Sequence, residues 1–140
     1  MDLEATLKSV PLLSGLDRKT LERLAEHAKR RTYAPGERIV TQDAPASALY
    51  VILRGRVTVE RGHGDPLERI GDLGAGDFFG ELALIEEHPR TATVTAAEET
   101  ECVLFVAWEF TALLKEFPQI AVPLLMELIR RTHRREHHMD

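Results

Sequence analysis

Residues 76–94 read Gly-Asp-Phe-Phe-Gly-Glu-Leu-Ala-Leu-Ile-Glu-Glu-His-Pro-Arg-Thr-Ala-Thr-Val. Gly76 and Gly80 predict a tight backbone in which a strand turns directly into a short helix, because glycine adopts conformations that other residues avoid. The first N–H groups of such a helix lack intrahelical partners and can hold a phosphate. Arg90 offers a planar guanidinium that matches phosphate oxygens, and Glu81 offers a carboxylate that accepts from a sugar hydroxyl. The stretch therefore predicts a small ligand with both a phosphate and a ribose.

This stretch resembles the phosphate-binding cassette of the cyclic nucleotide-binding domain family. The resemblance rests on Gly80-Glu81-Leu82-Ala83-Leu84-Ile85 followed by Pro89-Arg90-Thr91-Ala92-Thr93-Val94, in the order and spacing of the family. Further landmarks lie upstream, namely Pro35-Gly36-Glu37, Ile39, Gln42 and the run from Tyr50 to Val57. Asp43 departs from the family, many of whose members have glycine there. The resemblance covers nearly the whole chain.

By this resemblance, Glu81 binds the ribose 2′-hydroxyl and Arg90 binds the cyclic phosphate, which the backbone N–H groups of Ala83 and Thr91 also hold. The implied ligand-binding residues are Gly80, Glu81, Leu82, Ala83, Arg90 and Thr91. The ligand that the resemblance implies is cAMP or cGMP. Thr91 resembles a threonine that cGMP-selective members use, but Gly71 stands where those members often carry an arginine. We therefore expect cAMP to bind and cGMP to be tolerated.

Many short strands separated by turn residues predict a sandwich or a roll with Greek-key connections and not a parallel α/β sheet. Together with the resemblance, this pattern leads us to expect a mainly β fold with flanking α-helices, an antiparallel, jelly-roll-like β-roll. We expect a single domain over residues 1–140. An N-terminal helix is expected over 17–29, where Leu16 and Leu21 bracket the N-cap Asp17 as a hydrophobic staple. The roll is expected over 32–106, with the cassette at 76–94 and a short cassette helix, and C-terminal helices over 107–137.

Individual elements carry finer expectations. The run from Leu49 to Leu53 turns at Gly55 into Val57-Thr58-Val59, which predicts a hairpin. Thr91, Thr93 and Thr95 are expected on one face of a strand, with Ala92, Val94 and Ala96 on the other. Pro118 suits the first turn of a helix, and Pro123 predicts a kink. The apolar stripe expected on this last helix consists of Leu124, Leu125, Leu128 and Ile129.

Composition agrees with one globular domain. The chain has 140 residues, 44% hydrophobic and 29% charged, and no apolar run approaches the roughly 20 residues that span a bilayer. The beginning, Met1-Asp2-Leu3-Glu4, does not resemble a signal peptide. The net charge of −5 argues against a general nucleic-acid binder. A lone cysteine, Cys102, lies in an apolar run and is expected to be a core residue. We expect a cytoplasmic protein.

The resemblance implies a sensor or regulatory module, not an enzyme, that couples cyclic nucleotide occupancy to movement of its C-terminal helices. A C-terminal helix residue would cap the base, one of Leu125, Met126, Leu128, Ile129, Arg130 and Arg131. The expected partners are the cyclic nucleotide and an effector protein of unknown identity, with a homodimer through the C-terminal helix as one option. We expect no cofactor, metal, membrane span or direct DNA binding. The alternative is a degenerate cyclic nucleotide-binding fold that acts only as a protein-interaction module.

Overall fold

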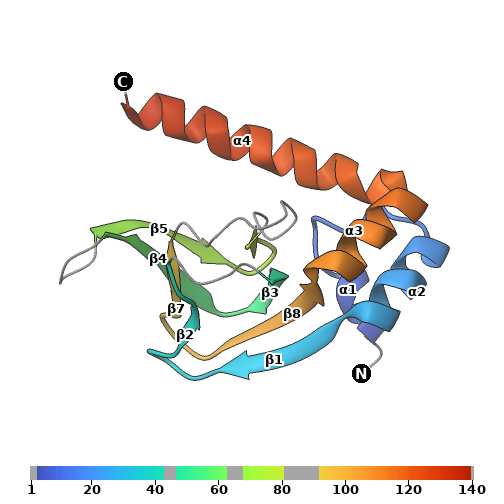
Figure 1. Ribbon diagram of the computed structural model, residues 1–140, viewed down its shortest axis with the longest axis horizontal. Coiled ribbons are helices and arrows are strands. Elements are labelled where there is room, and N and C mark those ends of the chain that lie inside the picture. Colours follow the sequence, from blue (N-terminus) through green and yellow to red (C-terminus); the bar gives the residue numbers. More distant parts are fainter. Residues whose placement is uncertain (1–2, 43–46, 63–67, 81–91, 140) are drawn as a thin grey trace. The chain divides into compact units, whose positions relative to one another are not determined.

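The computed structural model describes residues 3–42, 47–62, 68–80 and 92–139, without the side chains of 134–139. The chain divides into two compact units. One unit comprises His27–Thr111 and holds the strands, and the other comprises Met1–Glu26 with Ala112–Asp140 and is helical (Figure 1).

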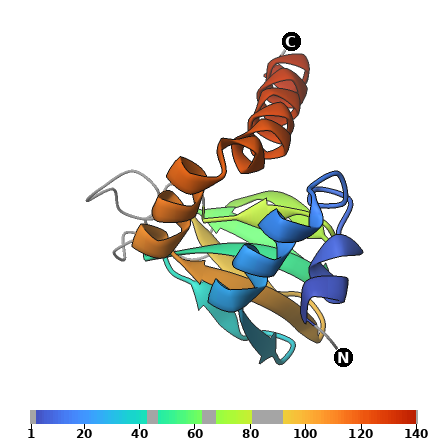
Figure 2. The ribbon, with the colours of Figure 1, turned by 90° about the vertical axis from the view of Figure 1, so that its right-hand side faces the viewer.

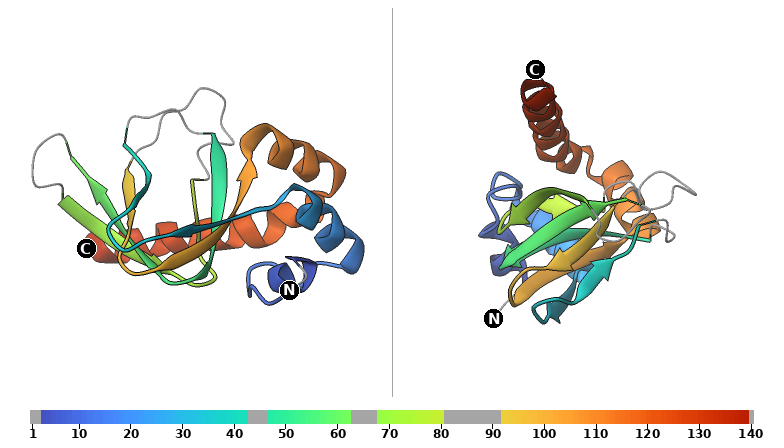
Figure 3. Two further views of the ribbon diagram at one scale, coloured as in Figure 1. Left: turned by 90° about the horizontal axis from the view of Figure 1, so that it is seen from below. Right: turned by 90° about the vertical axis from the view of Figure 1, so that its left-hand side faces the viewer.

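The strand unit is an antiparallel roll of two four-stranded sheets (Figure 3). One sheet has the order β1-β8-β3-β6 and the other has the order β2-β7-β4-β5. The strands are β1 (Lys29–Tyr33), β2 (Arg38–Val40), β3 (Ala48–Arg54), β4 (Arg56–Arg61), β5 (Glu68–Gly74), β6 (Phe78–Phe79), β7 (Thr93–Ala96) and β8 (Thr100–Val106). The predicted β-roll with flanking helices is confirmed.

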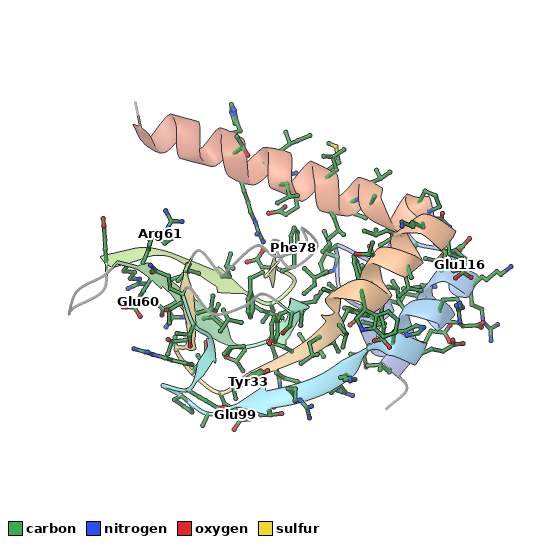
Figure 4. The ribbon with its side chains drawn as sticks, viewed as in Figure 1. Tyr33, Glu60, Arg61, Phe78, Glu99 and Glu116 are labelled. Carbon is green, nitrogen blue, oxygen red and sulfur yellow. The ribbon has the colours of Figure 1, made fainter. Side chains whose placement is uncertain are left out.

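The core of the roll is built from residues of both sheets. Its buried members are Ile52, Val57, Phe79, Val94 and Cys102. Tyr33, labelled in Figure 4, packs against this cluster from β1. Burial raises the pKa of the Cys102 thiol to about 12, so this side chain is a neutral, small core residue, as its apolar neighbours in the sequence predicted.

The predicted hairpin around Gly55 is wrong, because β3 and β4 belong to different sheets. Arg54 lies opposite Glu101 of β8, whereas Arg56 lies opposite Gly74 of β5. Gly55 has a φ of 98° and makes the corner between the sheets. A glycine marks a change of direction in the sequence, but it does not say which strand the chain will pair with next.

The N-terminal helix begins where the sequence predicted. The backbone N–H of Thr20 donates to the Asp17 carboxylate at 2.9 Å, so Asp17 caps α2 (Arg18–His27). Hydrogen bonds from Thr20 lower the pKa of Asp17. The helix ends at His27, before the predicted residue 29, because Lys29 already belongs to β1. The roll therefore begins at Lys29 and not at residue 32, and a further helix, α1 (Leu3–Lys8), precedes α2 (Figure 2).

The C-terminal segment consists of α3 (Ala107–Glu116), the 3₁₀ turn η2 (Pro118–Ile120) and α4 (Ala121–Met139). Pro118 occupies the first turn of η2, as predicted. The break in the helical segment lies at η2, and Pro123 falls in the first turn of α4, where its missing N–H removes no intrahelical hydrogen bond. Among the described helices, none combines the length and apolar character needed to cross a membrane.

Hydrogen bonds tie α2 to the segment around η2 within the helical unit. The Gln119 side-chain amide donates to the Thr20 hydroxyl at 2.9 Å, and Thr20 is fully buried. Arg23 pairs with Glu116 at 3.1 Å. A buried hydroxyl that has found its partner stabilises the position of both elements, because either partner alone would leave a polar group unsatisfied.

Candidate ligand-binding site

The structure describes the two chain segments that flank the predicted site, up to Gly80 and from residue 92 onward. Gly80 is the only predicted ligand-binding residue within the described ranges. Glu81, Leu82, Ala83, Arg90 and Thr91 lie outside the described residues. The strands that lead into and out of residues 81–91 therefore define where this segment starts and ends.

A tight turn precedes the site and is fixed to β3. The N–H of Asp77 donates to the carbonyl of Gly74 at 3.0 Å, and the N–H of Gly74 donates to the Asp77 carboxylate at 2.9 Å. Gly76, with a φ of 92°, occupies the turn position that requires a positive φ. Ile52 of β3 donates its N–H to the Asp77 carbonyl and accepts from the N–H of Gly76, both at 2.8 Å. The turn cannot move without breaking bonds to the centre of a sheet.

Strand β6 carries the chain from this turn to Gly80. Its two residues, Phe78 and Phe79, are buried and pair with Val51 and Tyr50 of β3. Phe78 is labelled in Figure 4. The rings of Tyr50 and Phe79 stack with centroids 4.8 Å apart. Gly80 follows with a φ of 83°, a conformation that other residues rarely adopt. The two positive φ angles at Gly76 and Gly80 are the tight backbone that their positions in the sequence predicted.

The chain re-enters the described structure in the other sheet. Strand β7 lies between β2 and β4, and its first residue, Thr93, is 2% exposed. Thr93 and Val94 are both buried, so at this end of β7 the threonine face is covered as well as the apolar face. The Thr93 hydroxyl accepts from the backbone N–H of Gln42 at 3.0 Å. Residues 81–91 thus start from one sheet and end in the other.

Sequence reasoning missed the residues that support the site. Asp77 closes the preceding turn, Tyr50 stacks on Phe79, and Thr93 bonds to Gln42. Gln42 stood out only as a landmark of the resemblance, without a role. The signal at Asp77 was local, since an Asp after Gly-Ala-Gly is typical of a turn that its side chain closes. The contacts of Tyr50 and Thr93 depend on strand order, which local sequence does not reveal.

The inner face of β5 is open at Gly71. Gly71 lies opposite Val59, and Leu73, two residues further along, packs against the core, so both point to the same face. A Cβ atom added at Gly71 would meet no heavy atom of the described residues within 4 Å. An alanine at position 71 would therefore meet no steric conflict with the described residues.

The sequence was compared with known protein families and with individual proteins. The family model named "Cyclic nucleotide-binding domain" matches residues 30–117. The chain is 32% identical over 135 residues to the cyclic AMP receptor protein of Thermus thermophilus, covering 96% of this chain and 62% of that protein. It is 40% identical over 93 residues to the type II regulatory subunit of cAMP-dependent protein kinase from Drosophila melanogaster, covering 66% of this chain and 25% of that protein.

Solved structures agree. The crystal structure of the catabolite activator protein of Thermus thermophilus is similar with a TM-score of 0.80 and 31% identity, over 93% of this chain and 62% of that one. The regulatory domain of Toxoplasma gondii PKA in a co-crystal with cAMP has a TM-score of 0.75 and 28% identity, over 89% and 49% of the two chains. The chain thus spans less than two thirds of these relatives. In sequence and in fold, this chain belongs to the cyclic nucleotide-binding domain family.

Proposed function

We propose that this chain binds a 3′,5′-cyclic nucleotide, namely cAMP with cGMP tolerated, and passes the occupancy of the site to its C-terminal helices. The observation that carries the proposal is the pair of positive φ angles at Gly76 and Gly80, 92° and 83°, at the start of the motif. Both glycines lie just before residues 81–91, in a roll that belongs to this family. We further propose that an effector protein in the cytoplasm responds to this change in the C-terminal helices.

The proposed roles follow from the chemistry of each group. Glu81 accepts from the ribose 2′-hydroxyl, Arg90 holds the phosphate oxygens as a planar donor, and the N–H groups of Ala83 and Thr91 complete the phosphate contacts. Gly80 and Leu82 complete the proposed set of ligand-binding residues. Each group acts as a holder of the ligand, so the proposed role is regulatory and not catalytic.

Isothermal titration calorimetry with cAMP, cGMP, 5′-AMP and adenosine tests this function. We expect one cAMP per chain, because the chain carries one cassette. We expect 5′-AMP and adenosine to bind far more weakly, because they lack the cyclic phosphate that the cassette encloses. Absence of binding by both cyclic nucleotides in a folded protein would favour the alternative, a degenerate fold that acts only through protein interaction.

Selectivity between the two bases is expected to be low. Strong discrimination needs a polar partner that only the correct base satisfies, and Gly71 supplies none. We expect any preference for cGMP to stay below about a hundredfold, or about 2.7 kcal/mol. Gly71→Arg should shift the preference toward cGMP by about tenfold, because an arginine paired with guanine contributes about 1–3 kcal/mol of discrimination. Gly71→Ala, which adds no donor, is the control and should leave the ratio of the two affinities unchanged.

The C-terminal helix is the proposed output element. Ligand can move α4 only if it binds one position of the helix better than another. On adding cAMP, we expect slower hydrogen exchange in residues 118–137 as well as around residues 80–91. We also expect deletion of the residues after Leu124 to weaken cAMP binding while the roll stays folded. Protection confined to residues 80–91 would contradict the coupling and would leave α4 a structural element.

The exposed face of α4 also supports a homodimer. Val122, Leu125, Met126 and Ile129 are 60%, 57%, 46% and 52% exposed and follow helical i, i+3, i+4, i+7 spacing, whereas the predicted stripe is buried only at Leu124. We expect sedimentation equilibrium to detect a dimer that Leu125→Glu abolishes. Ala112→Glu, which adds the same charge at an exposed position of α3, should leave the dimer intact. A wild-type protein that stays monomeric at high concentration would rule this interface out.

A further inference from the structure

Gln42 joins three chain segments at one end of the sheet β2-β7-β4-β5. It follows β2, and its backbone N–H donates to the hydroxyl of Thr93, the first residue of β7, at 3.0 Å. Its side-chain oxygen Oε1 accepts from the backbone N–H of Gly62, just after β4, at 3.0 Å. β2 and β4 are the two neighbours of β7 in this sheet. Gln42 therefore bonds directly to β7 and also to the residue that follows β4, the strand on the other side of β7, and we call these two hydrogen bonds the brace.

These two hydrogen bonds lie just beyond the last backbone pairing between β2 and β7. Val40 lies opposite Val94, and the β2–β7 pairing is irregular in register. Beyond Val40, the backbone N–H of Gln42 is bonded by a side-chain hydroxyl and not by a strand carbonyl. Both bonds are partly buried, so neither N–H can exchange its partner for water without cost.

The two hydrogen bonds determine which residues could replace Gln42 or Thr93 without losing them. Gly62 offers a backbone N–H, so the side chain at position 42 must present an acceptor at the end of a chain of the length of glutamine. Glutamate retains that oxygen, whereas leucine has a similar size and no acceptor. At position 93, serine retains the hydroxyl, whereas valine has the shape of threonine without it.

We propose that Gln42 is a positioning residue for the ligand-binding site: its side-chain bond to Gly62 holds its backbone in the place from which its N–H bonds to Thr93, three residues after Arg90 and two after Thr91. It does not touch the ligand and acts through Thr93. The proposal rests on the proposed function, since the affinity that it modulates is that for a cyclic nucleotide.

Calorimetry with cAMP compares Gln42→Leu with Gln42→Glu. We expect Gln42→Leu to weaken binding by about tenfold, the equivalent of 1.4 kcal/mol and typical of one lost hydrogen bond. We expect Gln42→Glu to bind like the parent. Thermal unfolding of each ligand-free variant shows that the measurement is made on folded protein, so that a general loss of stability does not account for the difference. Parent-like binding by Gln42→Leu, or equal loss in both variants, would overturn the proposal.

A second measurement needs no ligand. Hydrogen exchange on the ligand-free proteins should be faster at residues 62 and 92–94 in Gln42→Leu than in Gln42→Glu. If the parent binds no cyclic nucleotide, the proposed function fails while this comparison still tests the brace. In a double-mutant cycle, Thr93→Val and Gln42→Leu should not be additive, because both disturb one network. Unchanged exchange at these residues, or full additivity, would overturn the proposal.

Discussion

Replacing Gly55 with alanine is expected to destabilise the roll by roughly 2–5 kcal/mol, the sum of a left-handed backbone cost of about 1–2 kcal/mol and an overpacking cost of about 1–3 kcal/mol. Gly55 has a φ of 98°, and an added Cβ would lie 2.5 Å from the Thr100 hydroxyl oxygen and 2.6 Å from the Glu99 carbonyl oxygen. The neighbouring Thr100 cannot easily retreat, because its hydroxyl bonds to the carbonyls of Arg56 and Glu98. Because domains of this size are stable by about 5–15 kcal/mol, one methyl group should remove a large part of the total.

Urea unfolding followed by circular dichroism measures this effect, and two other glycines separate its causes. Gly36 has a φ of 87° but no heavy atom of the described residues within 4 Å of an added Cβ, so Gly36→Ala carries only the backbone cost. Gly71→Ala carries neither cost. Reactivity of the buried Cys102 thiol gives a second readout of unfolding. If Gly55→Ala were no less stable than Gly36→Ala, the corner would not be as tightly packed as the structure indicates.

Arg90→Ala is expected to weaken cAMP binding by about thirtyfold or more. Removing one partner of a buried charge pair costs about 2–5 kcal/mol, and each 1.4 kcal/mol changes the affinity tenfold. The stability of the ligand-free protein should change little. In the parent, cAMP at a hundredfold excess over its Kd should stabilise the fold by about 2.7 kcal/mol, and this gain should be much smaller in the variant.

Two further variants identify what Arg90 contributes. Arg90→Lys retains the charge without the planar fork, so its affinity should lie between those of the parent and the alanine variant. Arg54→Ala removes an exposed arginine that pairs with Glu99 at 2.9 Å, and it should bind cAMP like the parent. If the Arg90→Ala protein bound cAMP with the parent's affinity, the proposed site would be wrong. Equal losses of affinity in Arg90→Ala and Arg54→Ala would point to a nonspecific effect of charge.

Features with a local physical cause were open to prediction. Asp17 caps α2 through a bond to a residue three positions away, and Pro118 begins η2 because its ring favours a first turn. Gly76 and Gly80 adopt positive φ because glycine alone does so without penalty. In each case the deciding interaction lies within a few residues along the chain.

Features that depend on strand order were not open to local reasoning. The corner at Gly55, the strand β1 formed by Lys29 and the exposed residues after it, and the open inner face at Gly71 all follow from which strands become neighbours. The bond between Gln42 and Thr93 joins residues 51 positions apart. The sequence by itself determined the family, the β-roll and the two glycines that precede the site. Only the tertiary structure decided what supports that site, because a hydrogen bond between distant segments exists only once the sheets have brought them together.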